Sequence, residues 1–234
     1  MTAPENTNGH SGPDVETQQT AAEGEPKPGA KPAPKPTRIL LIRHGVNDYV
    51  KKGLLAGRTP GVSLNENGMA QAQALAERLG GEKIAAVYSS PLERCQETAA
   101  PLAERLGVEL RSLEDVKETD CGEWTGQALE ELRKLEAWAQ VQVNPSGFRF
   151  PSGESMLEIQ VRMVKALDAL QRQHAEETIA VFSHSDPIKL AIGFYIGMPL
   201  DLFQRLEVSP ASISELDFSP LRVRLVRLND CAHV

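Results

Sequence analysis

Three short apolar runs constrain the fold of this chain more than any other feature of its sequence. They lie at residues 39–42, 84–88 and 178–182, and none of them alternates with polar residues. Uninterrupted runs of this length are typical of strands that are buried on both faces, as in a parallel sheet. A polar segment and then a helical pattern follow each run, so the chain alternates strand and helix. This pattern predicts an α/β fold in which helices cover both faces of a mostly parallel sheet.

Spacing and capping residues predict the other elements. Helices are predicted over residues 65–79, 90–106, 155–173 and 186–197, each with Asn, Ser or Asp at its start. Apolar residues at helical spacing predict a further helix over residues 127–142. Residues 46–64 and 111–126 are expected to be loops, and residues 108–110 a short strand. The segments 213–218 and 222–228 alternate more strongly, which favours a hairpin. The expected architecture is three-layer α/β/α, with an antiparallel element near the C-terminus.

The first 37 residues differ in composition from the rest of the chain. They are rich in Pro, Lys and Glu, and Val15 is their only branched aliphatic residue. Such a segment cannot bury enough apolar surface to offset the entropy of ordering. We expect a disordered tail over residues 1–37, with a partner-binding tail as the alternative, and one folded domain over residues 38–234.

Charge and cysteine usage narrow the functional classes. The net charge of −7 argues against a general nucleic-acid binder. No apolar run is long enough for a transmembrane helix, so no membrane partner is expected. Cys95, Cys121 and Cys231 are widely spaced and odd in number, which fits neither a disulfide framework nor a zinc site. The expected location is the reducing cytoplasm. The sequence carries no signal for an oligomeric state.

Cationic and imidazole side chains follow three of the predicted strands. Arg43 and His44 come directly after the first run, Arg94 lies in the first turn of the helix after the second, and His184 follows the 178–182 run. In parallel sheets the carboxyl ends of the strands share one edge, where ligands bind. The guanidinium groups of arginine and the N-termini of helices both bind phosphate oxygens well. The sequence therefore predicts a pocket for a phosphoryl group.

Six segments in order resemble the motifs of the histidine phosphatase superfamily, also called the phosphoglycerate mutase-like family. The resemblance spans about residues 38–228 and rests on Arg43-His44-Gly45, residues 89–99, residues 118–126, residues 181–184, residues 151–155, and Gly57 with residues 64–72. It implies that His44 is a nucleophile that forms a phosphohistidine and that Glu118 donates a proton. It also implies that Arg43, Arg94 and His184 bind the phosphoryl oxygens. No metal or cofactor is expected, because the arginines supply the charge that a metal ion supplies elsewhere.

The chain departs from the family pattern directly after the nucleophile. Val46, Asn47 and Val50 stand where relatives usually carry residues that bind phosphate or substrate, and Ser185 replaces a common glycine. Asn47 can still donate to a phosphate oxygen, and Arg58 and Ser185 are further candidate substrate contacts. These departures bear on the choice of substrate rather than on the chemistry.

The expected function is hydrolysis of a small phosphorylated metabolite, a phosphoric monoester. A phosphomutase that returns the phosphoryl group to its substrate is the first alternative. A non-catalytic protein that binds a phosphorylated ligand, or a scaffold, is the second.

Overall fold

The computed structural model describes residues 34–234. The first strand begins at Thr37, one residue before the expected start of the folded domain. Most of the predicted tail, residues 1–33, lies outside the described residues.

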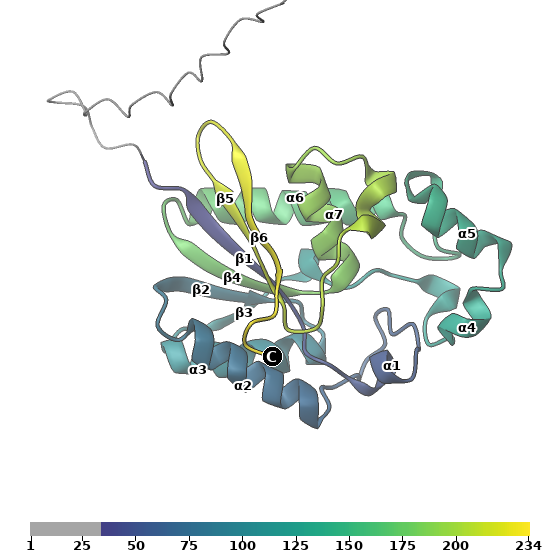
Figure 1. Cartoon of the computed structure of the whole chain (residues 1–234), viewed down its shortest axis with the longest axis horizontal. Coiled ribbons are helices and arrows are strands. Elements are labelled where there is room, and N and C mark those ends of the chain that lie inside the picture. The colour runs from purple at the N-terminus through teal and green to yellow at the C-terminus, as the bar shows by residue number, and fades with distance from the viewer. Residues whose placement is uncertain (1–33) are drawn as a thin grey trace, which may run out of the picture. The chain divides into compact units, whose positions relative to one another are not determined.

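A single six-stranded sheet forms the centre of the described fold (Figure 1). The strand order is β3-β2-β4-β1-β5-β6. The pairs β1–β4, β2–β4 and β2–β3 are parallel, whereas β1–β5 and β5–β6 are antiparallel. This confirms the mostly parallel sheet and the C-terminal antiparallel element. The strands are β1 (Thr37–Arg43), β2 (Ile84–Ser89), β3 (Leu110–Ser112), β4 (Thr178–Ser183), β5 (Ile213–Phe218) and β6 (Val223–Asp230).

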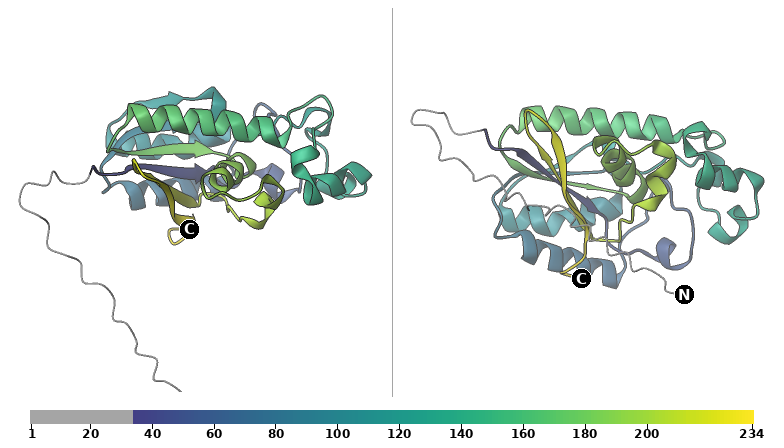
Figure 2. Two further views of the ribbon diagram at one scale, coloured as in Figure 1. Left: turned by 90° about the horizontal axis from the view of Figure 1, so that it is seen from above. Right: turned by 45° about the horizontal axis from the view of Figure 1, so that its top comes forward.

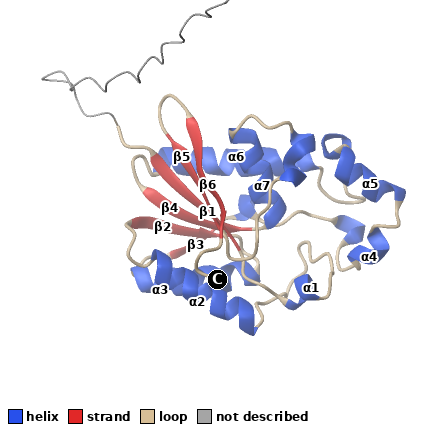
Figure 3. Cartoon of the chain, viewed as in Figure 1, coloured by secondary structure: helices blue, strands red, loops and turns tan. Residues whose placement is uncertain are grey.

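Helices cover both faces of the sheet (Figure 3). In Figure 1, α2 and α3 lie below the strands, α6 passes behind β5 and β6, and α7 lies to their right. The right-hand view of Figure 2 shows α6 along the top and α2 and α3 along the bottom, with the strands between them. The smaller helices α4 and α5 lie beyond one end of the sheet (Figure 1). The helices are α1 (Asp48–Lys51), α2 (Glu66–Leu79), α3 (Glu93–Leu106), α4 (Leu129–Leu132), α5 (Glu136–Val143), α6 (Met156–Gln173) and α7 (Ser185–Tyr195).

Burial on both faces explains the uninterrupted apolar run of β1. Ile39 and Leu41 pack into a core with residues of α6 and α7, whereas Leu40 and Ile42 pack into a second core with residues of α2 and α3. All four side chains are fully buried. Because successive side chains of a strand point to opposite faces, a strand between two helical layers needs apolar residues at every position.

The predicted helix over residues 127–142 is instead two helices, α4 and α5. Its expected apolar stripe is not continuous, because Leu132 is fully buried in a third apolar cluster while Leu135 is exposed. Residues 46–64, expected to be an irregular loop, include the single-turn helix α1. Strand β3 begins at Leu110 instead of residue 108, because the Val108 N–H bonds to Ala103 O at the end of α3.

No helix within residues 34–234 is long and apolar enough to cross a membrane.

Candidate active site

The two site histidines lie at the ends of neighbouring parallel strands. The register of β1 against β4 pairs Arg43 with Ser183, and the backbone N–H of His44 donates to Ser183 O at 3.0 Å. The next residues, His44 and His184, therefore leave the sheet side by side. Their ring centroids are 5.2 Å apart in an edge-on arrangement. Strand pairing thus brings together two residues that are 140 positions apart in the sequence.

Arg94 and Arg43 supply positive charge to the same place. Arg94 is fully buried in the first turn of α3, and its Nη2 donates to Gly57 O at 2.8 Å. Arg43 donates from Nη1 to Val208 O at 2.8 Å. Within residues 34–234, no hydrogen-bond partner reaches the buried Nε and Nη1 of Arg94, Nε of Arg43 or Nδ2 of Asn47. Buried donors are costly without a partner, so these four nitrogens favour a bound anion.

The hydrogen bond of His44 sets its tautomer. Its Nδ1 lies 2.8 Å from the backbone carbonyl oxygen of Gly45, which can only accept, so Nδ1 carries the proton. Burial, followed by the charges of Arg43 and Arg94, holds the pKa of His44 well below its ordinary value. The ring is therefore neutral near pH 7, and Nε2 keeps a free lone pair. This is the state in which an imidazole is nucleophilic.

Gly45 and Gly68 allow the segment after β1 to approach α2 closely. A Cβ at Gly45 would lie 2.8 Å from Gly68 O, and a Cβ at Gly68 would clash with Val46 O. The N–H of Gly45 also donates to the Thr98 hydroxyl at 3.0 Å. These contacts fix the peptide whose carbonyl orients His44.

His184 is fully buried between Ser90 and Glu118. Its Nε2 lies 2.9 Å from Ser90 Oγ, and its Nδ1 lies 3.6 Å from Glu118 Oε2. Burial and the nearby Arg94 charge hold the pKa of His184 well below its ordinary value. Cys95 Sγ also contacts this ring at 3.4 Å, but burial raises the pKa of that thiol to about 12, so it is not a nucleophile.

Two helix starts next to the site differ from the predicted positions. Helix α3 begins at Glu93 without a side-chain cap, rather than at Ser90. Ser90 Oγ accepts from the Leu92 N–H at 3.3 Å and also lies 2.9 Å from His184 Nε2. Helix α7 begins at Ser185, so that His184 occupies the cap position expected for Asp186. Sequence reasoning read Ser90 as a helix cap and therefore missed it as a site residue.

Glu118 places a carboxyl group at the same cavity. Its Oε1 accepts from the Thr119 N–H at 2.9 Å, and its side chain is 18% exposed. Burial raises the pKa of this carboxyl, with a further contribution from Asp186, against the opposing charge of Arg94. A raised pKa lets this carboxyl hold its proton to a higher pH than an ordinary glutamic acid does, which suits an acid–base role.

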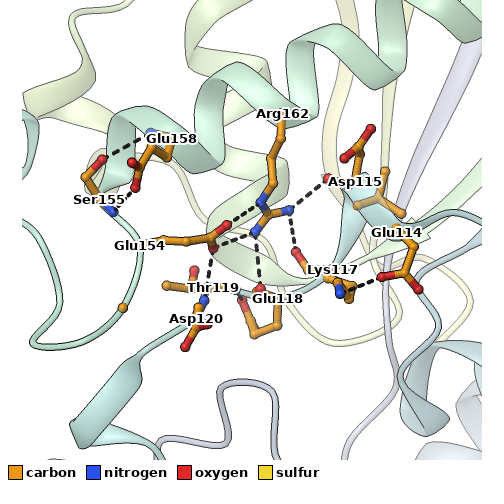
Figure 4. Close-up of polar contacts among 12 residues, drawn as sticks. Glu114, Asp115, Lys117, Glu118, Thr119, Asp120, Glu154, Ser155, Glu158 and Arg162 are labelled. Atoms are coloured by element: carbon orange, nitrogen blue, oxygen red, sulfur yellow. Dashed lines mark hydrogen bonds and ion pairs between the residues drawn. The ribbon is translucent and has the colours of Figure 1, made fainter.

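The loop that carries Glu118 is held by Arg162 of α6 (Figure 4). Arg162 Nη1 donates to the carbonyl oxygens of Asp115 and Lys117 at 2.8 and 2.7 Å, and Nη2 donates to that of Glu118 at 3.1 Å. Arg162 also forms an ion pair with Glu154, whose Oε2 accepts from the Asp120 N–H. Arg162 was missed from the sequence because its spacing fits an ordinary helix surface.

Arg58 lies behind this loop rather than in the cavity. Its Nε donates to Glu118 O at 2.9 Å, and its Nη atoms form ion pairs with Asp120 and Glu154. It does not line the cavity, whereas Asn47 and Ser185 do. Asn47 Oδ1 also caps α1 by accepting from the Val50 N–H. The structure therefore gathers the predicted site residues around one space, except Arg58 and His184. The ring nitrogens of His184 face Ser90 and Glu118, so His184 contacts the site without lining the space.

That space is a cavity of about 230 Å³. Ligand atoms of His44, Glu118 and His184 lie within 4.8 Å of one another, a grouping that could hold a metal ion. Two guanidinium groups line the same cavity and repel cations. The charge around the cavity therefore suits a small anion better than a metal.

Comparisons with known proteins agree with this geometry. The sequence model of the histidine phosphatase superfamily (branch 1) matches residues 39–231. Phosphoserine phosphatase 1 of Hydrogenobacter thermophilus is 28% identical over 202 residues, which cover 84% of this chain and 94% of that protein.

Solved structures show the same fold. A mutant phosphoserine phosphatase from Entamoeba histolytica, in complex with phosphoserine, is 27% identical with a TM-score of 0.78 and covers 85% of this chain and 99% of its own. YhfR from Bacillus stearothermophilus is 23% identical with a TM-score of 0.80, covers 84% of this chain and 98% of its own, and supports the fold alone.

Proposed function

The chain belongs to the histidine phosphatase superfamily, and we propose that it hydrolyses a small phosphoric monoester through a phosphohistidine on His44. One observation carries this proposal. Four buried donor nitrogens of Arg43, Arg94 and Asn47 lack a partner within residues 34–234, and these residues line the same cavity as the neutral His44. Such an arrangement stabilises phosphoryl oxygens next to a nucleophile.

In the first half-reaction, Nε2 of His44 attacks phosphorus while the bond from phosphorus to the leaving oxygen breaks. Arg43, Arg94 and Asn47 donate from the four buried nitrogens to the equatorial oxygens, where charge accumulates. Glu118 gives its proton to the leaving alcohol. The raised pKa of Glu118 keeps that proton available at higher pH than in an ordinary glutamic acid.

In the second half-reaction, the carboxylate of Glu118 takes a proton from water, and the water oxygen attacks phosphorus. The bond between phosphorus and Nε2 breaks, and inorganic phosphate leaves. His44 returns to its neutral state and Glu118 to its protonated state, so the cycle is balanced.

The phosphomutase alternative requires a second place for an anion. A separate hollow adjoins the cavity at Arg43 and Ser185 and is also lined by Lys189 and Arg205. Lys189 Nζ already lies 3.6 Å from Asp186 Oδ1, which offsets its charge. Arg205 is exposed in the same hollow, so a mutase would hold its second phosphate there.

A panel of phosphate esters tests the proposal. We expect inorganic phosphate to be released stoichiometrically with the alcohol, and release to stop in His44→Ala. Phosphoryl transfer between alcohols with little release would identify a mutase. Absence of both release and transfer across the panel would leave a binding protein.

A further inference from the structure

The cavity has a charged end and an apolar wall. His44, Arg43, Arg94 and Glu118 form the charged end. The wall is formed mainly by apolar side chains, namely Val50, Leu54, Leu55, Leu129 and Phe150. The uncharged polar side chains of Asn47, Thr119 and Ser185 also line the cavity. Because the phosphoryl group occupies the charged end, the alcohol part of the substrate faces this wall.

Backbone pairing builds this wall as a defined surface. The N–H of Leu55 donates to Gln127 O at 2.9 Å, the N–H of Gly126 donates to Leu55 O at 2.7 Å, and the N–H of Leu129 donates to Gly53 O at 2.8 Å. Phe150 is buried against Trp124 in the third apolar cluster. The wall therefore offers the substrate a fixed apolar surface.

Among the described residues that line the cavity, the guanidinium groups of Arg43 and Arg94 are the only lysine or arginine charges, and both are at the phosphoryl end. The acidic residues Glu118 and Asp186 also line it. A carboxylate on the leaving group would thus meet apolar atoms without a lysine or arginine among the lining residues to pair with it. Placing an unpaired charge there is strongly unfavourable.

Cationic residues near the cavity are outside it or already paired. Arg58 is bound to Glu118 O, Asp120 and Glu154 behind the acid loop. Lys189 lines the neighbouring hollow and pairs with Asp186. Lys51 and Lys52 are exposed and do not line the cavity.

We propose, on the basis of the function proposed above, that the substrate is the monophosphate ester of a small alcohol that is uncharged and largely apolar. The volume of about 230 Å³ is below the range of roughly 300–1,000 Å³ usual for drug-sized ligands, which limits the alcohol to a short group. This substrate class differs from the phosphoserine bound in the Entamoeba structure, which carries a carboxylate and an amine.

Val50 is the position at which this preference can be changed. It lies in α1, is 42% exposed and lines the cavity, so a longer side chain can be accommodated without disturbing the core. A lysine there would give a leaving-group carboxylate the cation that the wall lacks. Val161 on α6 is also 42% exposed but lies outside the cavity, so Val161→Lys is a matched control.

The test compares butyl phosphate with 4-phosphooxybutyrate, in which a carboxylate replaces the terminal methyl group. For the unmodified chain we expect kcat/KM for butyl phosphate to be higher by about tenfold or more. Val50→Lys should shift the ratio toward the carboxylated ester by about tenfold, and Val161→Lys should leave it unchanged.

Equal or better hydrolysis of the carboxylated ester would overturn the proposal while leaving the phosphatase function intact. If Lys189→Met then removed that preference, the neighbouring hollow would be the carboxylate site. If the chain hydrolyses none of butyl phosphate, the carboxylated ester and p-nitrophenyl phosphate, the catalytic function itself is contradicted.

Discussion

Glu118 acts in two protonation states during the proposed reaction. It must hold a proton to release the alcohol and lose it to activate water. Burial raises its pKa, and Arg94 and the Thr119 N–H oppose that shift. These opposing influences keep both protonation states accessible.

Glu118→Gln removes the proton donor without changing the size of the side chain. We expect kcat for alkyl phosphates to fall by about a hundredfold or more, because an alkoxide is a poor leaving group without protonation. Aryl phosphates should be slowed much less, because phenolates leave without help. Steady-state rates with phenyl, p-nitrophenyl and butyl phosphate measure the difference. Equal slowing of all three would remove Glu118 from the role of acid.

At the scale of elements, the Glu118 loop depends on α6. Arg162 donates to three carbonyl groups of the loop, and Glu154 forms an ion pair with Arg162 from the segment before α6 (Figure 4). Arg162 touches neither the cavity nor His44 and is therefore a positioning residue.

Arg162→Met should move Glu118 while leaving the nucleophile in place. We expect alkyl phosphate turnover to fall by about ten- to a hundredfold, since small displacements of catalytic groups have effects of this size. Turnover of p-nitrophenyl phosphate should change little. Arg172→Met on the same helix alters an exposed arginine and serves as the control. A uniform loss with both esters would indicate general unfolding instead.

The strands and long helices could be predicted from the sequence because local patterns define them. The apolar run of β1 and the Asn65 and Ser155 caps of α2 and α6 are such patterns. The shared edge of the sheet could also be predicted for Arg43, His44, Arg94 and His184, because these residues come after the ends of strands. The roles of Arg162 and Ser90 could not be predicted, because they depend on contacts with residues more than 40 positions away. The break between α4 and α5 likewise depends on which leucines the third apolar cluster buries.

At the scale of the whole molecule, two buried histidines of the site lower the free energy of unfolding in acid. His44 and His184 are buried with pKa values well below the ordinary value. Above about pH 6.5 both are neutral whether the chain is folded or unfolded, so their contribution to stability is fully present. Below that pH the two histidines take up protons in the unfolded chain but stay neutral in the folded chain. Their contribution to stability is therefore lost as the pH falls toward the lowered pKa values.

His44→Gln should therefore flatten the acid side of the stability curve. Each such histidine contributes a slope of up to about 1.4 kcal/mol per pH unit in the free energy of unfolding. Urea denaturation at pH 7.5 and 5.5 gives that slope for both proteins. Identical slopes would mean that His44 takes up its proton as readily in the folded chain as in the unfolded chain.

The most direct test of the account is the chemical identity of the phosphorylated intermediate. The Gly45 carbonyl holds the proton of His44 on Nδ1, so the phosphoryl group must be on Nε2. Rapid quenching with a labelled ester, followed by digestion and mass spectrometry under basic conditions, should find an acid-labile Nε2-phosphohistidine on the His44 peptide. The label should be absent in His44→Ala. Steady hydrolysis without this species, or label on Nδ1 or on another residue, would contradict the account.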